Sequence, residues 1–381
     1  MPLTMRCDGV YDCDDHSDEK DCDILGINDN TYRKEEPPVV RGQKTKIETS
    51  IIFEEIEHID ELLMQMKVRF RITLQWKDSR LFFRNLKYED NMLSEASQKQ
   101  IWIPTLLFIN SVMNIKISAN DPKHIKVNRM SDPTERENLG LNEDLYFPGD
   151  QNTISLLAQY DEHFRCSFDM HFYPFDVQTC SIKLMVSETI KNQVSLTPSN
   201  LQFSGPKELL QFTVQDLDVT MERNNSLISW TLILRRNPIG HLATTYFPTL
   251  SIIIMALITL FINDSHFEAV IMVALTCMLV MYTLFQSIST YTPNTAYLTL
   301  LDIWLIFGLS MPFFVFMCEV SLELIDDSKI YQIQVNGKNI QKELIGSKRD
   351  NVKKIIQVIL PISTAVFIVA YLLVVIVSSY A

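Results

Sequence analysis

The sequence predicts an all-β extracellular domain followed by four membrane-spanning helices, and three observations carry this prediction. Hydrophobic residues make up 47% of the 381 residues, but long apolar blocks occur only after about residue 237. Strand-like alternation precedes this point, and residues 50–237 contain no helix-like periodicity of comparable strength. Cysteines with disulfide-like spacing also lie before the first long apolar block, which is typical of a domain in an oxidising compartment.

Composition and motifs exclude several functional classes. The chain has 34 basic and 46 acidic residues, so its net charge is −12. This argues against nucleic-acid binding, which needs a basic face. The sequence contains no metalloprotease helix, phosphate-binding loop or G-x-S-x-G motif. We therefore expect no enzyme activity, no required cofactor and no nucleic-acid partner.

The extracellular half carries clear strand signals. From Val68 to Trp76, apolar residues alternate with polar ones, which is the period of a half-buried strand. Residues Trp230–Leu234 show a similar pattern. Residues 46–237 are therefore expected to form a β-sandwich. The polar segment 23–45, which contains two consecutive prolines, is expected to be a linker.

Four apolar blocks are long enough to cross a bilayer, which takes about 20 residues. They are Leu242–Ile262, Phe267–Ser289, Tyr297–Cys318 and Ile355–Ser378. A buried helix of a soluble protein would explain one such block but not four in series. We expect transmembrane helices 1–3 within residues 238–318, a cytosolic loop at 319–354 and the fourth helix within 355–381.

The cysteines also set the expected orientation. Disulfide-like spacing before the first span favours an extracellular N-terminal half, and four spans return the C-terminus to the outside. Asn224 begins an N-glycosylation sequon on the extracellular side. The chain is therefore expected to be a multi-pass protein of the plasma membrane.

Residues 1–22 are rich in cysteine and acidic side chains. Residues 7–22 read CDGVYDCDDHSDEKDC, and they resemble the C-terminal half of an LDL-receptor class A module. In that family a calcium ion organises a fold too small to have a core. The resemblance implies a disulfide between Cys7 and Cys22, with a solvated acidic tail as the alternative. The calcium ligands that it implies are the carboxylates of Asp8, Asp12, Asp18 and Glu19, with the carbonyl groups of Met5 and Val10.

A second cysteine pair encloses the most informative segment. Cys166 and Cys180 bracket thirteen residues, SFDMHFYPFDVQT, ahead of the four spans. Over residues 46–381 the chain resembles the Cys-loop family of pentameric ligand-gated ion channels. W-x-D-x-R-L at residues 76–81 and W-x-P at 102–104 agree with this family, although Thr105 replaces its aspartate. The resemblance implies a disulfide between Cys166 and Cys180 and a pentameric channel.

The resemblance gives the loop between these cysteines a role in coupling ligand binding to the pore. In the family it presses on the link between the second and third spans, here Thr290–Thr295. The residues expected to act in coupling are Asp60, Glu61, Phe172, Pro174, Phe175, Asp176, Arg236 and Pro293. The Tyr173–Pro174 bond is expected to be cis, as in tight turns. A purely structural staple is the alternative.

The second span is expected to line the pore. Five of its residues recur on one helical face. They are Met272, Thr276, Leu279, Thr283 and Gln286. Five copies would form a leucine ring near mid-membrane, and such a ring can close a pore by dewetting. Ordinary helix packing is the alternative.

Ion selectivity is less clearly encoded. Residues 266–270 match neither the Gly-Glu-Lys of the family's cation channels nor the Pro-Ala-Arg of its anion channels. Glu268 lies one position deeper than the usual selectivity glutamate, and an acidic ring attracts cations. We therefore expect cation selectivity. An anion-conducting, pH- or metal-responsive channel is the alternative, because the second and third spans resemble an invertebrate branch that includes such channels.

The resemblance also places an agonist pocket between subunits, in a box of aromatic residues that holds amines. Spacing from the motifs puts Arg71, Ile109, Ser187 and Glu188 at positions of this box, and Met221 at its last loop. Because aromatic residues are missing, simple amines are expected to be poor agonists. An anionic or amphipathic ligand, or a proton, is expected to act near Arg71 and Glu188.

The sequence thus predicts a homopentameric ligand-gated ion channel subunit. Its expected partners are four identical or related subunits, the lipid bilayer, a small ligand or proton, and permeating ions. His58 and His171 fall near the expected coupling interface, where pH sensing and a structural role are both open. The alternative from another class is a non-conducting ligand-capture receptor that uses the LDL-A-like module. A transporter is disfavoured because no repeat or broken helix is visible.

Overall fold

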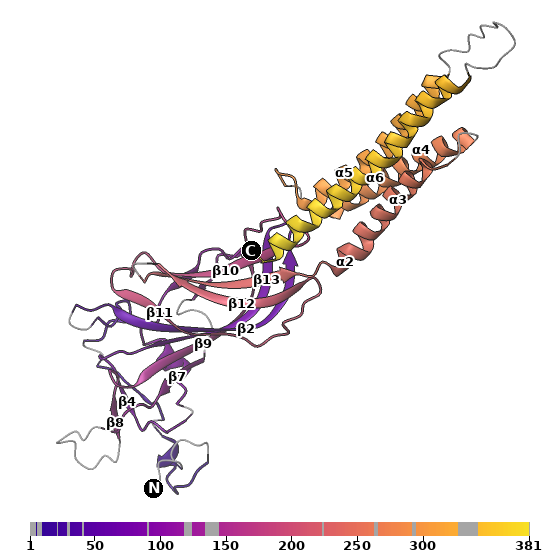
Figure 1. The fold of residues 1–381 in the computed structure, drawn as a ribbon. Coiled ribbons are helices and arrows are strands. Elements are labelled where there is room, and N and C mark those ends of the chain that lie inside the picture. Colours follow the sequence, from indigo (N-terminus) through magenta and orange to yellow (C-terminus); the bar gives the residue numbers. More distant parts are fainter. Residues whose placement is uncertain are drawn as a thin grey trace, which may run out of the picture. The chain divides into compact units, whose positions relative to one another are not determined.

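The computed structural model forms two compact units, which are described separately. The described residues are 5, 10–20, 22–28, 31–39, 42–89, 91–117, 124–133, 145–222, 225–262, 266–291, 295–326 and 342–380. The first unit comprises Met1–Ser167, Thr179–Leu209 and Val214–Leu234. The second unit comprises Phe168–Gln178, Leu210–Thr213 and Arg235–Ala381. Strands dominate the first unit and helices the second (Figure 1).

The first unit is a β-sandwich with two five-stranded sheets. Sheet one has the order β11 (Val194–Phe203), β2 (Thr45–Asp60), β3 (Gln65–Trp76), β9 (Thr153–Arg165) and β7 (His124–Asn128). Sheet two has the order β12 (Phe212–Met221), β13 (Leu227–Arg236), β10 (Val177–Val186), β5 (Leu106–Phe108) and β6 (Lys116–Ile117). In sheet one, β11 runs parallel to β2, whereas the β2–β3 and β3–β9 pairs are antiparallel.

Alternating side chains build the core of this sandwich. In β3 every second residue is buried, which confirms the alternation expected from Val68 to Trp76. Strand β13 alternates in the same way and buries Trp230 completely. Phe70 of β3 packs against Phe108 of β5 and Phe164 of β9, with ring centroids 5.6 and 5.7 Å apart. Each such buried side chain stabilises the fold by about 1.5–3 kcal/mol.

The segment 23–45, expected to be a linker, contains residues that pack into the first unit. Strand β1 (Leu25–Gly26) joins a small third sheet in the order β1, β4 (Phe82–Arg84) and β8 (Tyr146–Pro148). The Asp23 carboxylate accepts the hydroxyl of Ser97, whose Oγ lies 2.5 and 2.6 Å from its two oxygens. Ser97 belongs to the short helix α1 (Glu95–Gln98). A strand of two residues is too short to show the alternation of a strand, so β1 could not be predicted from the sequence.

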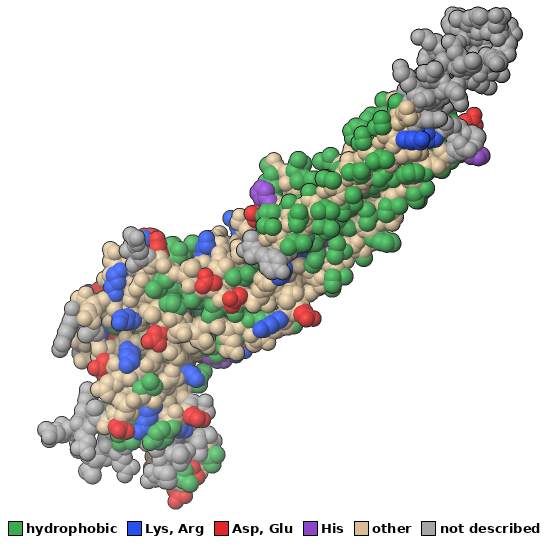
Figure 2. Space-filling view, in the orientation of Figure 1, with side chains coloured by type: hydrophobic (Ala, Val, Ile, Leu, Met, Phe, Trp, Pro, Cys, Tyr) green, Lys and Arg blue, Asp and Glu red, His purple; other side chains and the backbone are tan. Residues whose placement is uncertain are grey.

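Among its described residues, the second unit holds four helices long and apolar enough to cross a membrane. Its elements are α2 (Ile239–His241), the π-helix η3 (Leu242–Tyr246), α3 (Phe247–Thr259), α4 (Phe267–Tyr291), α5 (Leu300–Asp326) and α6 (Lys342–Tyr380). The first span runs through α2, η3 and α3. Hydrophobic side chains cover much of the helical surface in view (Figure 2), as expected of helices in lipid. The ends of α5 and α6 extend into residues 319–354, where a loop was expected.

Small residues and paired polar groups pack these helices together. Ala256, Leu260, Cys277 and Val315 form a buried cluster contributed by three of the spans. Small side chains of this kind let helix backbones approach closely. The hydroxyl groups of Tyr246 and Tyr371 lie 2.6 Å apart, so these polar groups are paired within the unit.

Candidate functional site

The cysteine loop, residues 167–179, is the first part of the candidate site. A disulfide joins Cys166 to Cys180, with their Cα atoms 5.0 Å apart. The Tyr173–Pro174 peptide bond is cis, which confirms the expectation from the sequence. Residues 168–178 of this loop belong to the helical unit, although the strands on either side belong to the sandwich. The centre of the loop therefore packs in the same unit as the membrane-spanning helices.

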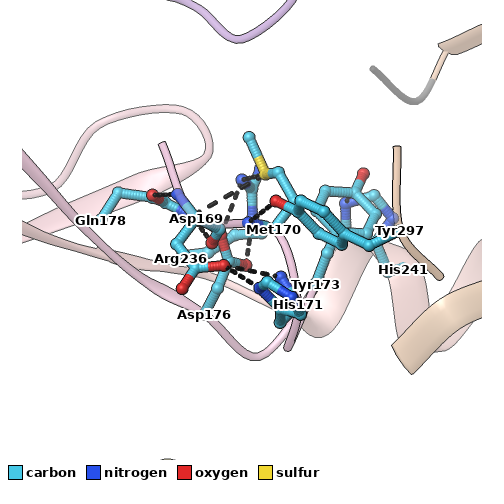
Figure 3. A network of polar contacts seen from close by, with 9 residues as sticks. All are labelled: Asp169, Met170, His171, Tyr173, Asp176, Gln178, Arg236, His241 and Tyr297. Atoms are coloured by element: carbon cyan, nitrogen blue, oxygen red, sulfur yellow. Dashed lines mark hydrogen bonds and ion pairs between the residues drawn. The ribbon is translucent and has the colours of Figure 1, made fainter. Parts of the chain in front are cut away.

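A buried ion pair anchors the loop. Arg236 Nε lies 2.7 Å from Asp176 Oδ1, and Arg236 donates a second hydrogen bond to Oδ2 at 3.1 Å (Figure 3). The two side chains are only 1% and 2% exposed. The guanidinium carbon also lies 4.5 Å from the centroid of the Tyr173 ring and 4.6 Å from that of Phe212. Two-pronged bonding between guanidinium and carboxylate fixes the orientation of both groups.

Gln178 completes the hydrogen bonding of this pair. Its amide nitrogen donates to Asp176 Oδ2 and to the backbone oxygen of Asp169, the latter at 2.6 Å. Its side-chain oxygen accepts the backbone N–H of Asp169 at 2.9 Å. A buried charge pair is tolerated when its remaining lone pairs and protons are satisfied in this way.

The same loop is bonded to the segment that precedes α5. The hydroxyl oxygen of Tyr297 accepts the backbone N–H of Met170 at 3.0 Å. The backbone N–H groups of Leu300 and Leu301 donate to the carbonyl oxygens of His171 and Tyr173, at 2.8 and 3.2 Å. These bonds use the first amides of α5, which have no partner within their own helix. The loop therefore contributes to the N-terminal cap of the third span.

Aromatic contacts connect the loop with the start of the first span. The Tyr173 hydroxyl lies 3.2 Å from Nε2 of His241 in α2, and the two rings meet edge to face. The ring of Phe175 lies 5.9 Å from that of Tyr246 in η3. Phe172 is 46% exposed. Of these two phenylalanines, both expected to act in coupling, Phe175 thus has a ring contact within the helical unit.

Two other expected coupling residues lie in the first unit. Asp60 ends β2, and its carboxylate accepts the N–H of Leu63 at 2.9 Å in the turn before β3. Glu61 belongs to the same turn. Pro293, which belongs to the expected link between the second and third spans, lies outside the described residues. The hydrogen bond from Leu63 shows that Asp60 stabilises the turn between β2 and β3.

Helix α4 has two opposite faces of different character. Val270, Ala274, Cys277 and Met281 form a buried stripe along one side of the helix. The residues expected to line the pore are all exposed and lie on the opposite side. Met272 is 68% and Leu279 64% exposed. Glu268 lies one helical turn before Met272 and is also exposed. One chain therefore leaves this stripe, with a carboxylate at its beginning, without cover from its own described helices.

The expected agonist-site residues lie on different sheets. Arg71 points outward from β3 of sheet one, where it pairs with Glu54. Ile109 follows β5, and Met221 ends β12, both in sheet two. These two side chains are 44% and 43% exposed.

The remaining expected positions follow β10 of sheet two. Ser187 Oγ lies 3.1 Å from the hydroxyl of Thr189, and Glu188 pairs with Lys191 at 3.2 Å. Arg71 thus lies on sheet one, whereas Ser187 and Glu188 follow a strand of sheet two.

A network of charges that the sequence analysis did not single out surrounds Arg71 on sheet one. Lys67 pairs with Glu57 at 2.5 Å and with Asp161 at 3.3 Å, and Arg69 pairs with Glu57 at 2.5 Å. The hydrogen bonds to Glu57 and Asp161 raise the pKa of Lys67. Strand alternation places these side chains on one face, but their pairing across strands depends on register, which the sequence did not provide.

A comparison with known sequence families shows to which family this chain belongs. The family described as the neurotransmitter-gated ion-channel ligand-binding domain matches residues 24–238, which is more than half of the chain. The chain belongs to this family of neurotransmitter-gated ion channels. The match begins at residue 24, in agreement with the packing of β1 and Tyr32 into the sandwich.

Curated relatives of this Cys-loop receptor chain include several γ-aminobutyric acid receptor subunits. The rho-3 subunit of Homo sapiens is 23% identical over 293 residues, covering 74% of this chain and 58% of the relative. The rho-2 subunit of Bos taurus is 23% identical over 295 residues, covering 74% and 58%. The beta-like subunit of Drosophila melanogaster is 24% identical over 290 residues, covering 71% and 54%. The chain thus spans little more than half the length of these relatives.

Membership in this family agrees with several expectations. Its members are ligand-gated receptors and not enzymes, and they need no cofactor. They assemble as pentamers of subunits in a membrane. The extracellular ligand-binding sandwich and the four spans have the organisation of plasma-membrane Cys-loop receptors.

The LDL-A-like segment of this receptor chain does not form a metal site among its described residues. Asp18 is buried, and its Oδ2 accepts the backbone N–H of Asp12 at 2.6 Å, which lowers the pKa of Asp18. Throughout the described ranges, no three acidic, histidine or cysteine side chains gather so as to hold a metal ion. The expected calcium site is thus not shown, and its ligand set is incomplete among the described residues. Cys22 is disulfide-bonded, whereas Cys7, Asp8 and Asn224 lie outside the described residues.

The structure places further residues, which the sequence did not indicate, beside the expected coupling residues. Tyr297 and His241 contact the cysteine loop, and Phe212 covers one face of Arg236. Tyr297 lies directly after the link between the second and third spans, so its position was a usable signal. Phe212 gave no such signal, because only the strand order brings it to the buried arginine.

Proposed function

We propose that this chain is a subunit of a pentameric ligand-gated ion channel, in which ligand binding to the extracellular sandwich opens a pore lined by α4. The observation that carries the proposal is the bonding of the cysteine loop to the starts of both the first and third spans. Family membership supports the same function. A homopentamer is the simplest assembly, since one chain carries residues for both sides of an intersubunit pocket.

The coupling step follows from the loop contacts. The Arg236–Asp176 pair holds the cysteine loop rigidly at the start of the first span, while Tyr297 and the first amides of α5 hold it at the third span. A shift of the loop would therefore move the ends of these helices together. A gate needs such an element with two discrete arrangements that ligand binding biases. Phe172, Pro174 and Phe175 shape the loop that transmits this shift.

The proposed agonist carries a carboxylate. Arg71 is a fixed cation on the outer face of sheet one, and its Glu54 partner would be displaced or shared when an anionic ligand binds. Similarity to γ-aminobutyric acid receptor subunits favours a ligand of this chemistry. Ile109, Ser187, Glu188 and Met221 are proposed to form the facing side of the pocket from the adjacent subunit. Simple amines remain poor candidates, because the aromatic box is incomplete.

Voltage-clamp recording of the full chain tests the agonist proposal. The panel contains γ-aminobutyric acid, other amino acids, simple amines, amphiphiles and pH steps. For the agonist found, Arg71→Ala is expected to raise the half-maximal concentration by about tenfold or more, since a charged hydrogen bond contributes about 1.5–3 kcal/mol. Arg69→Ala is the matched control, because Arg69 has the same face and similar ion pairs. An Arg71→Ala response equal to the parent response would remove Arg71 from the pocket.

We propose that Glu268 governs ion selectivity. Five copies would form an acidic ring at the pore mouth, which attracts cations and repels chloride. Similarity to γ-aminobutyric acid receptor subunits favours the anion-conducting alternative. Reversal potentials in swapped-ion solutions distinguish the two outcomes. If the channel is cation-selective, the reversal potential shifts when sodium is replaced, and this shift is smaller in Glu268→Gln. A reversal potential that instead shifts with chloride in the parent chain would establish anion conduction.

Residues 7–22 are assigned no calcium-dependent function in this proposal. The described carboxylates do not converge on a common point, so nothing in the described part of this segment favours a ligand-capture receptor over a channel. Recording with and without extracellular calcium checks this assignment. The agonist concentration for half-maximal current is expected to be the same in both solutions.

A further inference from the structure

His171 joins the cysteine loop to the segment before α5 through both its side chain and its backbone. Its ring stacks on the ring of Tyr297, with centroids 3.8 Å apart and planes 2° apart. Its Nδ1 lies 2.5 Å from Oδ1 of Asp169 (Figure 3), and its carbonyl oxygen accepts the N–H of Leu300. A titratable ring thus contacts both a carboxylate and an aromatic face.

Protonation of His171 strengthens both side-chain contacts. Histidine side chains change charge between about pH 5 and 8. An imidazolium is attracted to a carboxylate and to the electron-rich face of a phenol ring. Hydrogen bonds from His171 lower the pKa of Asp169, so Asp169 stays ionised throughout this range. The attraction between the loop and Tyr297 therefore increases as the pH falls.

The other charged groups on the surrounding elements have different hydrogen-bond partners. The pairs are Asp176 with Arg236 at the end of β13, His241 of α2 with Tyr173 of the loop, and Asp302 of α5 with Thr299. The side chains of His171 and Asp169 are 55% and 71% exposed. Protons therefore reach this pair from solvent, and the surrounding water limits the size of the effect.

We propose that His171 is a proton-binding regulatory site, at which acidification tightens the contact between the cysteine loop and the start of α5. The effect of this site on gating rests on the proposed channel function. The change in the contact does not, because it is measured without current.

Hydrogen–deuterium exchange of the purified full chain, followed by mass spectrometry, tests the contact directly. Peptides covering residues 168–173 and 295–301 contain the amides of Met170 and Leu300, which bond across it. After correction for intrinsic rates, their exchange is expected to be about two- to fivefold slower near pH 5.5 than near pH 8, as for an exposed ion pair. His171→Gln and Asp169→Asn should each remove this difference. Asp169→Asn retains the imidazole, so it remains informative if His171→Gln folds poorly.

His124→Gln is the matched control, because His124 is an exposed histidine of β7 in the first unit, and it should behave like the parent chain. A parent chain without pH-dependent exchange, or a His171→Gln chain that keeps it, would overturn the proton site. If the expected pH dependence of exchange is missing but the chain still conducts, only the proton site is overturned and the channel function stands. If exchange depends on pH as expected but the chain passes no current under any tested condition, the channel function is overturned and the proton site stands.

Discussion

Arg236 shows how one side chain links the chemistry of the loop to the membrane helices. It is the last residue of β13, and Pro238 begins the turn into α2 soon after it. Its charge is buried and neutralised by Asp176, and two aromatic rings cover it. In so dry an environment, a guanidinium left without its carboxylate is strongly unfavourable.

Asp176→Asn is expected to destabilise the protein severely. The change leaves Arg236 charged and buried without a counter-ion, at a cost of about 3–5 kcal/mol. The melting midpoint of the purified protein and its surface expression measure this loss. Asp161→Asn on the exposed sheet-one network is the control and should cost at most about 1 kcal/mol. If the two variants melted alike, the buried pair would not stabilise the unit.

Residue-level interpretation reached furthest where a motif fixed both type and spacing, as for the cis Tyr173–Pro174 bond. The resemblance to the Cys-loop family named Asp176 and Arg236 as coupling residues, and the structure pairs their side chains. It did not indicate Gln178 or Phe212, which contact the pair only because the loop folds back and a distant strand lies beside it. Spacing along the chain encodes local geometry, whereas such contacts depend on strand order and register.

Helix α4 is the element on which the proposed pore depends. Its buried stripe and its exposed stripe follow the same helical period on opposite sides. The sequence revealed the exposed stripe through its mixture of apolar and hydroxyl residues. It did not single out the buried stripe as a set, although small residues such as Ala274 and Cys277 are typical of helix–helix interfaces.

Leu279→Ser is expected to weaken the closed state of the pore. A polar ring at this level hydrates more readily than a leucine ring and so lowers the barrier to ions. Resting current and sensitivity to agonist should both increase relative to the parent. Leu284→Ser is the control, because Leu284 lies on the same helix but off the exposed stripe and is partly buried, and it should leave resting current unchanged. Equal effects of the two variants would place the gate elsewhere.

The segment around Tyr32 belongs structurally to the sandwich. The Tyr32 hydroxyl accepts the N–H of Trp102 at 2.8 Å and donates to Asp78 at 3.1 Å. Arg80 covers its ring, with 4.5 Å from the guanidinium carbon to the ring centroid. Composition suggested a linker here because the residues around Tyr32 are mostly polar, and the contacts that Tyr32 makes with Trp102 and Asp78 join segments far apart in the sequence.

Tyr32→Phe is expected to destabilise the sandwich by about 1–3 kcal/mol, since it leaves buried partners without their hydrogen bonds. Tyr11→Phe alters a tyrosine that is 67% exposed and should change stability by less than about 0.5 kcal/mol.

Burial, reinforced by Asp78, raises the pKa of Tyr32. The folded state therefore keeps this proton when an unfolded tyrosine loses it near pH 10. Stability should fall above that pH, and less steeply in Tyr32→Phe.

At the scale of the whole molecule, one chain is an incomplete channel. The expected agonist residues lie on two sheets, and the exposed stripe of α4 encloses nothing by itself. Closed rings of identical subunits resolve both features, because each chain then offers one surface to each neighbour. The sequence predicted the two-part architecture from apolar blocks, strand alternation and cysteine spacing, but subunit number entered only through family resemblance.

Single-particle imaging of the purified chain in lipid nanodiscs tests this account most directly. Five subunits are expected around one axis, with α4 innermost and residues 268–286 bordering a continuous central opening. A monomer, or a ring whose axis is filled by another helix, would contradict the proposed pore.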